Sequence, residues 1–231
     1  MRPPQFDASG INVLDPNDKL GRKSRYITLV QERALERHLS NGGSGLTVDV
    51  GCGFGRLTPA LARRGGKTIG IDPSEELIRF ASERDATSSY LVGALPMLPL
   101  RRGSVGLLVL HNVLKPLMQM GKLHCVEGIH EYLSDDAVVA VVENFRRGHA
   151  EFIDRDDLVS IMKAEGLVET KFIPVRAARN PLLPFIRYGL VPERWLGRLA
   201  DAEVDAMRRK TSVPRHQYWN TLVLFENRSA A

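Results

Sequence analysis

The sequence has 231 residues, of which 43% are hydrophobic and 26% charged, enough apolar material for one substantial core and a single domain. No stretch approaches the roughly 18–20 apolar residues of a membrane span, and residues 1–7 lack the apolar run of a secretory signal. The two cysteines, Cys52 and Cys125, indicate neither a disulfide framework nor a metal site. We therefore expect a soluble cytoplasmic protein that binds no metal.

The net charge of +5 is unevenly distributed along the chain. From Lys171 to the end there are 11 Lys and Arg against 5 Asp and Glu, whereas residues 1–170 hold 21 against 22. The basic surplus therefore belongs to the C-terminal part, where it bears on substrate or surface and not on the fold.

Strand and helix patterns alternate along the chain. Short apolar runs predict strands at 46–50, 67–72, 89–92, 105–110, 137–142, 167–175 and 218–225. Helical periods and helix-start signals predict helices at 24–39, 57–62, 75–82, 117–133, 157–164 and 193–209. This order favours an α/β fold, with a seven-stranded, mostly parallel sheet, helices on both faces and an insertion between strands six and seven.

The turn after the first strand is the most informative stretch, and residues 48–56 read VDVGCGFGR. Glycines spaced two apart suit a backbone that turns sharply and comes close to a ligand. The spacing differs from the G-x-G-x-x-G fingerprint of dinucleotide sites, and a carboxylate at Asp49 would repel a pyrophosphate. Asp49 is instead suited to holding a cationic ligand or to bracing the loop.

The second strand ends at Asp72, with Ser74 as a helix cap just beyond it. Ligands of open α/β sheets bind outside the carboxyl ends of the strands. A carboxylate at that position can accept hydrogen bonds from both hydroxyls of a ribose, so Asp72 is a candidate ribose ligand. Without the glycine loop it would be interpreted as a solvated turn residue.

These two segments resemble the motifs of class I S-adenosylmethionine-dependent methyltransferases, and the resemblance extends from Ser24 to Phe225. It implies S-adenosylmethionine as cofactor. We expect one domain with four parts: a helical lid (1–45), a cofactor core (46–175), a substrate cap (176–216), which matches nothing specific in the family, and a last strand (217–226). The cofactor-binding residues that the resemblance implies are Arg25, Asp49, Gly51, Cys52, Gly53, Asp72, Pro73, Ala94, Leu95, His111 and Asn112.

Two positions depart from the family pattern. Gly93 stands where many members have an acid that contacts the adenine amino group, which leaves backbone groups of Ala94 and Leu95 for that role. Val105 and Gly106 replace the usual Phe-Asp that opens the fourth strand. These departures keep open a catalytically inactive, methyltransferase-like binding protein.

His111 and Asn112 follow the fourth strand and would lie beside the transferred methyl. His111 is the catalytic candidate, because imidazole titrates near neutral pH and can act as a base toward a hydroxyl or amine. The alternative is that His111 packs against the cofactor without moving a proton. Arg25, at the start of the lid helix, either pairs with the cofactor carboxylate or is one of several solvent-exposed basic residues at the beginning of that helix.

The insertion should determine the substrate. It joins an apolar, proline-broken stretch (180–192) to a predicted helix with interspersed arginines. A cap over the site, a surface that touches anionic lipid, contact with nucleic-acid phosphates and ordinary core packing are the alternatives. The nucleic-acid alternative is disfavoured, because the chain has no concentrated lysine tract. The substrate-binding candidates are Tyr26, Tyr188, His216 and Tyr218.

The sequence as a whole predicts methyl transfer from S-adenosylmethionine to a hydroxyl or amine of a small, anionic or partly apolar molecule. An RNA methyltransferase is the alternative within the same class of enzyme. The chain gives no indication of the oligomeric state.

Overall fold

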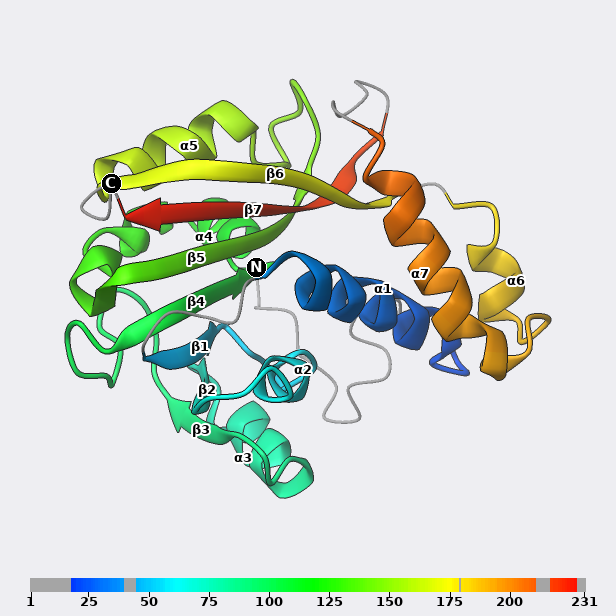
Figure 1. Cartoon of the computed structure of the whole chain (residues 1–231), viewed down its shortest axis with the longest axis horizontal. Coiled ribbons are helices and arrows are strands. Elements are labelled where there is room, and N and C mark those ends of the chain that lie inside the picture. The colour runs from blue at the N-terminus through cyan, green and yellow to red at the C-terminus, as the bar shows by residue number, and fades with distance from the viewer. Residues whose placement is uncertain (1–17, 40–44, 179, 211–216, 228–231) are drawn as a thin grey trace.

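The computed structural model describes residues 18–39, 45–178, 180–210 and 217–227. Seven strands form one sheet in the order β3-β2-β1-β4-β5-β7-β6 (Figure 1). Strands β1 to β5 pair in parallel, and β7 is antiparallel to both of its neighbours, as the sequence pattern predicts for a mostly parallel sheet. The strands are β1 (Leu46–Val50), β2 (Thr68–Asp72), β3 (Ser89–Val92), β4 (Val105–His111), β5 (Leu133–Phe145), β6 (Leu167–Ala177) and β7 (Trp219–Asn227).

Helices cover both faces of this sheet (Figure 1). They are α1 (Arg22–His38), α2 (Thr58–Ala62), α3 (Glu75–Arg84), α4 (Leu114–Gln119), α5 (Arg155–Ala164), α6 (Leu183–Arg187) and α7 (Leu196–Met207). Short 3₁₀ helices occupy Leu123–Val126, Ile129–Tyr132 and Glu193–Trp195. The chain between β6 and β7 contains α6 and α7 and corresponds to the predicted insertion (176–216), except that Arg176 and Ala177 belong to β6.

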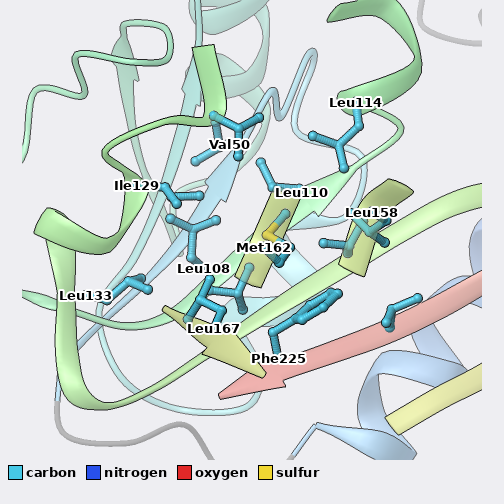
Figure 2. Close-up of a cluster of buried hydrophobic side chains, with 14 of the residues drawn as sticks. Val50, Leu108, Leu110, Leu114, Ile129, Leu133, Leu158, Met162, Leu167 and Phe225 are labelled. Carbon is cyan, nitrogen blue, oxygen red and sulfur yellow. The ribbon is translucent and has the colours of Figure 1, made fainter. Parts of the chain in front are cut away.

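The central strands are buried on both faces, and their side chains alternate between two cores. Leu108 and Leu110 of β4 point into a cluster with α4 and α5 (Figure 2). Leu107 and Val109 point into a second cluster, which contains residues of α1, α2, α6 and α7. Successive side chains of a strand point to opposite faces of the sheet, and both faces of β4 are buried. The sequence of β4 is therefore a continuous apolar run.

The predicted helix over 117–133 is wrong. The structure has α4 and then two 3₁₀ turns, separated at Gly121 and Gly128, which have φ values of 67° and 81°. A left-handed glycine ends a helix, so the apolar residues of this segment reach the core from short turns and not from one continuous helix. Among the described helices, none is long and apolar enough to cross a membrane.

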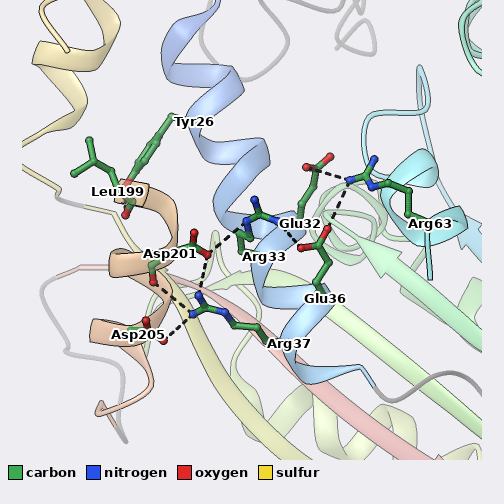
Figure 3. Close-up of polar contacts among 9 residues, drawn as sticks. All are labelled: Tyr26, Glu32, Arg33, Glu36, Arg37, Arg63, Leu199, Asp201 and Asp205. Carbon is green, nitrogen blue, oxygen red and sulfur yellow. Dashed lines mark hydrogen bonds and ion pairs between the residues drawn. The ribbon is translucent and has the colours of Figure 1, made fainter. Parts of the chain in front are cut away.

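Helix α1 lies between the insertion and the glycine-loop side of the sheet (Figure 3). On one side Arg37 bonds to Asp201 and Asp205 of α7, at 2.8 and 2.7 Å. On the other, Arg63 beyond α2 reaches Glu32 and Glu36 at 3.5 and 3.7 Å. Apart from Glu32, which is 19% exposed, these side chains are 30–61% exposed, so the pairs orient the helices and contribute little stability each.

Candidate cofactor and active site

The glycine loop has the left-handed backbone that only glycine adopts readily, in keeping with the sharp turn that its sequence predicts. Gly51, Gly53 and Gly55 have φ values of 71°, 57° and 76°. A Cβ at Gly51 would lie 2.5 Å from Cγ2 of Val113, and one at Gly55 would lie 2.6 Å from the Tyr90 hydroxyl. A Cβ at Gly53 would meet nothing within 4 Å. The outer two glycines therefore permit close packing, while the middle one faces open space.

Asp49 lies beneath this loop and not over it. Its side chain is buried, with 2% of the residue exposed, and it accepts a 2.7 Å hydrogen bond from the Thr58 hydroxyl in α2. Burial raises the pKa of Asp49 to about 6. The carboxyl group thus joins β1 to α2 and braces the turn, and its direct contact with a cofactor stays a prediction. Cys52, beside it in the loop, is also buried.

Asp72 joins the glycine loop to the start of α3. Its Oδ2 accepts from the Gly53 N–H at 2.9 Å, and its Oδ1 accepts from the Ser74 N–H, also at 2.9 Å. Burial raises its pKa. Each carboxylate oxygen can accept a second bond, so these contacts hold the loop without excluding a ribose. Pro73 follows and is exposed.

Asn112 is the one residue other than glycine with a positive φ, 53°, in the part of the chain that the structure describes. Its N–H donates to the Val142 carbonyl at 2.9 Å, which fixes the turn at the end of β4. Its Oδ1 is buried without a hydrogen-bond partner among the described residues. A strained residue with an unpaired buried oxygen at the carboxyl end of a central strand is typical of a ligand site.

His111 is held against Arg56, a residue that the sequence analysis missed. One amino nitrogen of Arg56 lies 3.3 and 3.1 Å from Nδ1 and Nε2 of His111. Burial, and then the nearby guanidinium, lower the pKa of His111 well below its usual value. Burial also lowers the pKa of Arg56, to about 10. At neutral pH the imidazole is therefore uncharged and the guanidinium charged.

Arg56 also fixes α1 over the loop. Its other amino nitrogen donates to the Thr28 hydroxyl at 2.9 Å and to Oε1 of Gln31 at 2.7 Å. Gln31 donates in turn to Asn220 of β7 at 2.9 Å, and Asn220 donates to Asn144 of β5 at 3.1 Å. The only sequence signal for Arg56 was its place directly after the third glycine.

A cavity of about 350 Å³ lies beside the loop, between α1 and α3. Its lining includes three aromatic rings and three arginines: Phe54, Phe80, Tyr90, Arg25, Arg56 and Arg84. The Arg25 guanidinium is at its edge, 3.2 Å from Glu193 of the insertion, and both side chains are more than half exposed. The predicted role of Arg25 toward a cofactor carboxylate thus requires it to exchange partners, whereas Arg56 is already held next to the loop.

The structure explains why position 93, at the end of β3, is glycine and not an acidic residue. A Cβ there would lie 2.6 Å from Cδ of Pro99 and 3.2 Å from Cγ2 of Ile71, so no side chain fits. Ala94 is exposed and Leu95 half-buried directly after it, and their contact with adenine stays a prediction.

The predicted substrate residues are not brought together. Tyr26 is fully buried, and its hydroxyl donates to Glu203 of α7 at 2.6 Å, so its assignment to substrate binding was wrong. It was misread because its packing partner is 177 residues away in sequence. Tyr188 is 68% exposed on the outer surface of the insertion, and His216 lies outside the described residues.

Tyr218 belongs to an aromatic cluster near the carboxyl ends of β4 and β5. Its ring stacks on Phe152 at 5.3 Å, and the Lys115 ammonium lies 4.5 Å from the centre of the Phe152 ring. Lys115 is in the first turn of α4, just beyond Asn112. Phe152 was not expected from the sequence, because loop residues carry no periodic signal, and Lys115 lies before residue 117, where the predicted helix was taken to begin.

Glu143 is a buried carboxyl group at the end of β5, with 1% of the residue exposed. Its Oε1 accepts from the N–H groups of Leu114 and Lys115, at 2.9 and 3.3 Å. It thus satisfies free donors at the start of α4. Burial raises its pKa to about 7. Among the described residues, no cluster of His, Cys, Asp and Glu could hold a metal.

The residues present fit S-adenosylmethionine. The open space over Gly53 leaves room for a ligand close to the backbone, and the unpaired Asn112 oxygen could accept a hydrogen bond from an ammonium group. The fold is that of class I, S-adenosylmethionine-dependent methyltransferases, and the site has room and polar groups for their cofactor.

Comparisons with known proteins agree with this fold. Residues 48–140 match the model of the methyltransferase domain family. The ubiquinone biosynthesis O-methyltransferase of Methylococcus capsulatus is 37% identical over 78 residues, which span 34% of this chain but only 32% of that enzyme.

Solved structures share the fold at low identity. A SAM-dependent methyltransferase from Aquifex aeolicus superposes with a TM-score of 0.59 at 20% identity, covering 74% of this chain and 94% of that one. Geranyl diphosphate C-methyltransferase from Streptomyces coelicolor A3(2), solved with Mg²⁺, geranyl diphosphate and S-adenosyl-L-homocysteine, gives 0.58 at 16% identity, covering 89% and 82%.

Proposed function

We propose that this protein transfers the methyl group of S-adenosylmethionine to a hydroxyl or amine of a small, anionic or partly apolar acceptor. The observation that carries the proposal is the loop in which Gly53 faces open space while Asn112 presents an unpaired buried oxygen one strand away. The partial match to a ubiquinone biosynthesis O-methyltransferase supports a small acceptor and favours oxygen.

The cofactor would be held by the glycine loop, Asp72 and Asn112, with Arg25 or Arg56 as the cation for its carboxylate. When bound, it supplies an electrophilic methyl group on a sulfonium. The contribution of the chain is then to position the acceptor and exclude water, since the leaving group needs no further activation.

His111 is assigned to positioning in this proposal, which is one of the two roles that the sequence left open; the other was proton removal. The Arg56 guanidinium lies 3.1 Å from Nε2 and lowers the proton affinity of the imidazole. A base must have a pKa near the working pH to be efficient, and this imidazole has a pKa well below it. His111 would therefore contact the reacting groups as an uncharged ring.

The acceptor would bind at the carboxyl ends of β4 and β5, against Tyr218 and Phe152. Their stacked rings offer an apolar surface, and Lys115 adds a cation 4.5 Å from one of them. Such a combination suits an aromatic or otherwise apolar molecule that carries a negative charge. The insertion, which ends at Tyr218, would cover it.

Calorimetric titration with S-adenosylmethionine and S-adenosylhomocysteine, beside an NAD control, tests the cofactor assignment. We expect micromolar binding of the two sulfur ligands and none of NAD, with loss of binding in Asp72→Ala. Transfer of radiolabelled methyl groups to a panel of small phenols, carboxylic acids and amines, with RNA as a separate arm, then tests the acceptor class. Cofactor binding without transfer to any acceptor would favour the inactive, methyltransferase-like protein; a folded protein that binds neither ligand refutes the proposal.

A further inference from the structure

The insertion and the residues just before α1 expose several large apolar side chains. We call the following residues the apolar face, with exposures of 61, 53, 68, 70 and 50% in this order: Leu20, Phe185, Tyr188, Leu190 and Trp195. Single exposed apolar residues are ordinary on soluble proteins, whereas a group of them marks an interaction site. This face has no role in the site described above.

The local sequence explains why these side chains face outward. Pro184 lies in the first turn of α6 and Gly189, at φ 78°, ends the turn that follows it, so the helix has only five residues. Leu183 and Ile186, three apart, are buried against the core. Phe185 and Tyr188, also three apart, are therefore on the opposite side. That side is apolar, where an ordinary surface helix would be polar.

The start of α1 extends the apolar face. A Cβ at Gly189 would lie 3.4 Å from Cδ1 of Leu20, so these two segments are in contact. Arg22 fixes this contact, because its guanidinium donates to the carbonyls of Gly189 and Val191. In Figure 1 the start of α1 lies beside α6 and the adjoining turns, at one end of the molecule beyond the sheet.

Cations surround these apolar side chains. Arg194 and Arg198 are exposed next to Trp195, and Lys19 is exposed next to Leu20. The Arg187 guanidinium lies 5.5 Å from the centre of the Tyr188 ring. The one acidic side chain in this stretch of the insertion, Glu193, is paired with Arg25. The face thus combines apolar and aromatic groups with an excess of positive charge.

We propose that the apolar face docks on the surface of a lipid bilayer that contains anionic lipids. Trp and Tyr are enriched at membrane interfaces, because their rings are apolar and their N–H and O–H groups polar. The arginines complement anionic headgroups, and the apolar side chains enter the boundary with the acyl chains. The small size of the face makes the docking reversible. A nucleic acid would use the cations but not the apolar groups.

Co-sedimentation of the full chain with vesicles tests this proposal. We expect binding to phosphatidylglycerol–phosphatidylcholine vesicles that weakens with salt, and little binding to phosphatidylcholine alone. The variant R194Q/R198Q should reduce the partition coefficient about 30-fold, since each cation near the surface contributes about fivefold. The variant F185S/L190S/W195S should reduce it at least as much, because both the apolar and the cationic contributions are required.

The matched control is V92S/M97S, which removes two apolar side chains that are 47 and 81% exposed at the β3 end of the molecule. It should bind vesicles like the unchanged protein, and circular dichroism should show all variants folded. Unchanged vesicle binding in either test variant would overturn the proposal. Two other results would overturn it as well. In one, the unchanged chain does not bind vesicles but forms a dimer, and only F185S/L190S/W195S abolishes that dimer. In the other, the unchanged chain does not bind vesicles but binds RNA, and only R194Q/R198Q abolishes that binding. The readout is independent of methyl transfer, so it stands whether or not the proposed function is correct.

Discussion

Replacement of Gly53 by alanine separates ligand binding from stability. The residue has φ 57°, and alanine in this left-handed region costs about 1–2 kcal/mol of folding free energy. Because an added Cβ would meet no protein atom within 4 Å, no further loss of stability is expected. The methyl group would instead occupy the space assigned to the cofactor.

The matched control is Gly103→Ala, in the exposed turn before β4. Gly103 has φ 69° and also has nothing within 4 Å of an added Cβ, so its cost in stability should equal that of Gly53→Ala. Thermal unfolding should show both variants lowered by a few degrees, about 2–4 °C per kcal/mol for a chain of this size. Overpacking costs typically about 1–3 kcal/mol, so binding of S-adenosylhomocysteine to Gly53→Ala should weaken about 5- to 150-fold.

Calorimetric titration of the unchanged chain, Gly53→Ala and Gly103→Ala with S-adenosylhomocysteine tests whether the ligand lies over Gly53. Gly103→Ala should bind S-adenosylhomocysteine as tightly as the unchanged chain. If Gly53→Ala also binds with unchanged affinity, the ligand does not lie over the middle glycine, and the site as we have built it is refuted. An equal loss of affinity in both variants would trace the effect to the fold and not to the loop.

Three further substitutions test the electrostatics and the packing. Burial raises the pKa of Glu143 from 4.5 to about 7, so this carboxyl lowers stability as pH rises through about 7 and imposes no penalty below about 4.5. Glu143→Gln keeps an acceptor for the α4 donors, so it should raise the midpoint of thermal unfolding at pH 8 by an amount that reflects at most about 3 kcal/mol, and hardly change it at pH 4.5; equal effects at the two values would contradict this. Arg56→Met should raise the pKa of His111 part of the way toward its ordinary value, since burial remains, and an NMR titration of the imidazole that shows no change would disprove the coupling. Tyr26→Phe should lower stability by about 1–3 kcal/mol in urea unfolding, because Glu203 loses a buried donor, while S-adenosylhomocysteine affinity stays the same. Weakened S-adenosylhomocysteine binding in that folded variant would contradict the purely structural role that we assign to Tyr26.

Much of the fold could be predicted because its signals are local. The strand β4 is continuous in apolar residues since both of its faces are buried, and the cap at Ser74 accepts from Leu77 as its position predicts. The helix predicted over 117–133 failed because its apolar period was read through Gly121 and Gly128, whose backbones are left-handed. Periodicity records which side chains are buried, and a series of short turns can bury them as well as a helix does.

The candidate site could be predicted only where it follows the chain. The glycine loop and Asp72 were found from spacing, and the structure joins them through the Gly53 N–H. Arg56 was missed because its importance comes from three residues on other elements: Thr28, Gln31 and His111. Tyr26 was misassigned for the same reason, since its position beside Arg25 gave no sign that α7 would cover it.

The two ends of the insertion have a consequence for how such a protein can diversify. Ala177 and Trp219 are paired residues on β6 and β7, and the Ala178 N–H donates to the Tyr218 carbonyl, so the insertion leaves the sheet and returns to it at adjacent points. A segment anchored in this way can be lengthened, shortened or exchanged without altering the strand register, since the loop-closure entropy changes only slowly with length. Any replacement must still provide a surface for α1, where Tyr26 and Arg37 now meet α7. If the insertion covers the acceptor as proposed, this part of the acceptor site can vary from protein to protein while the strands and the glycine loop stay the same.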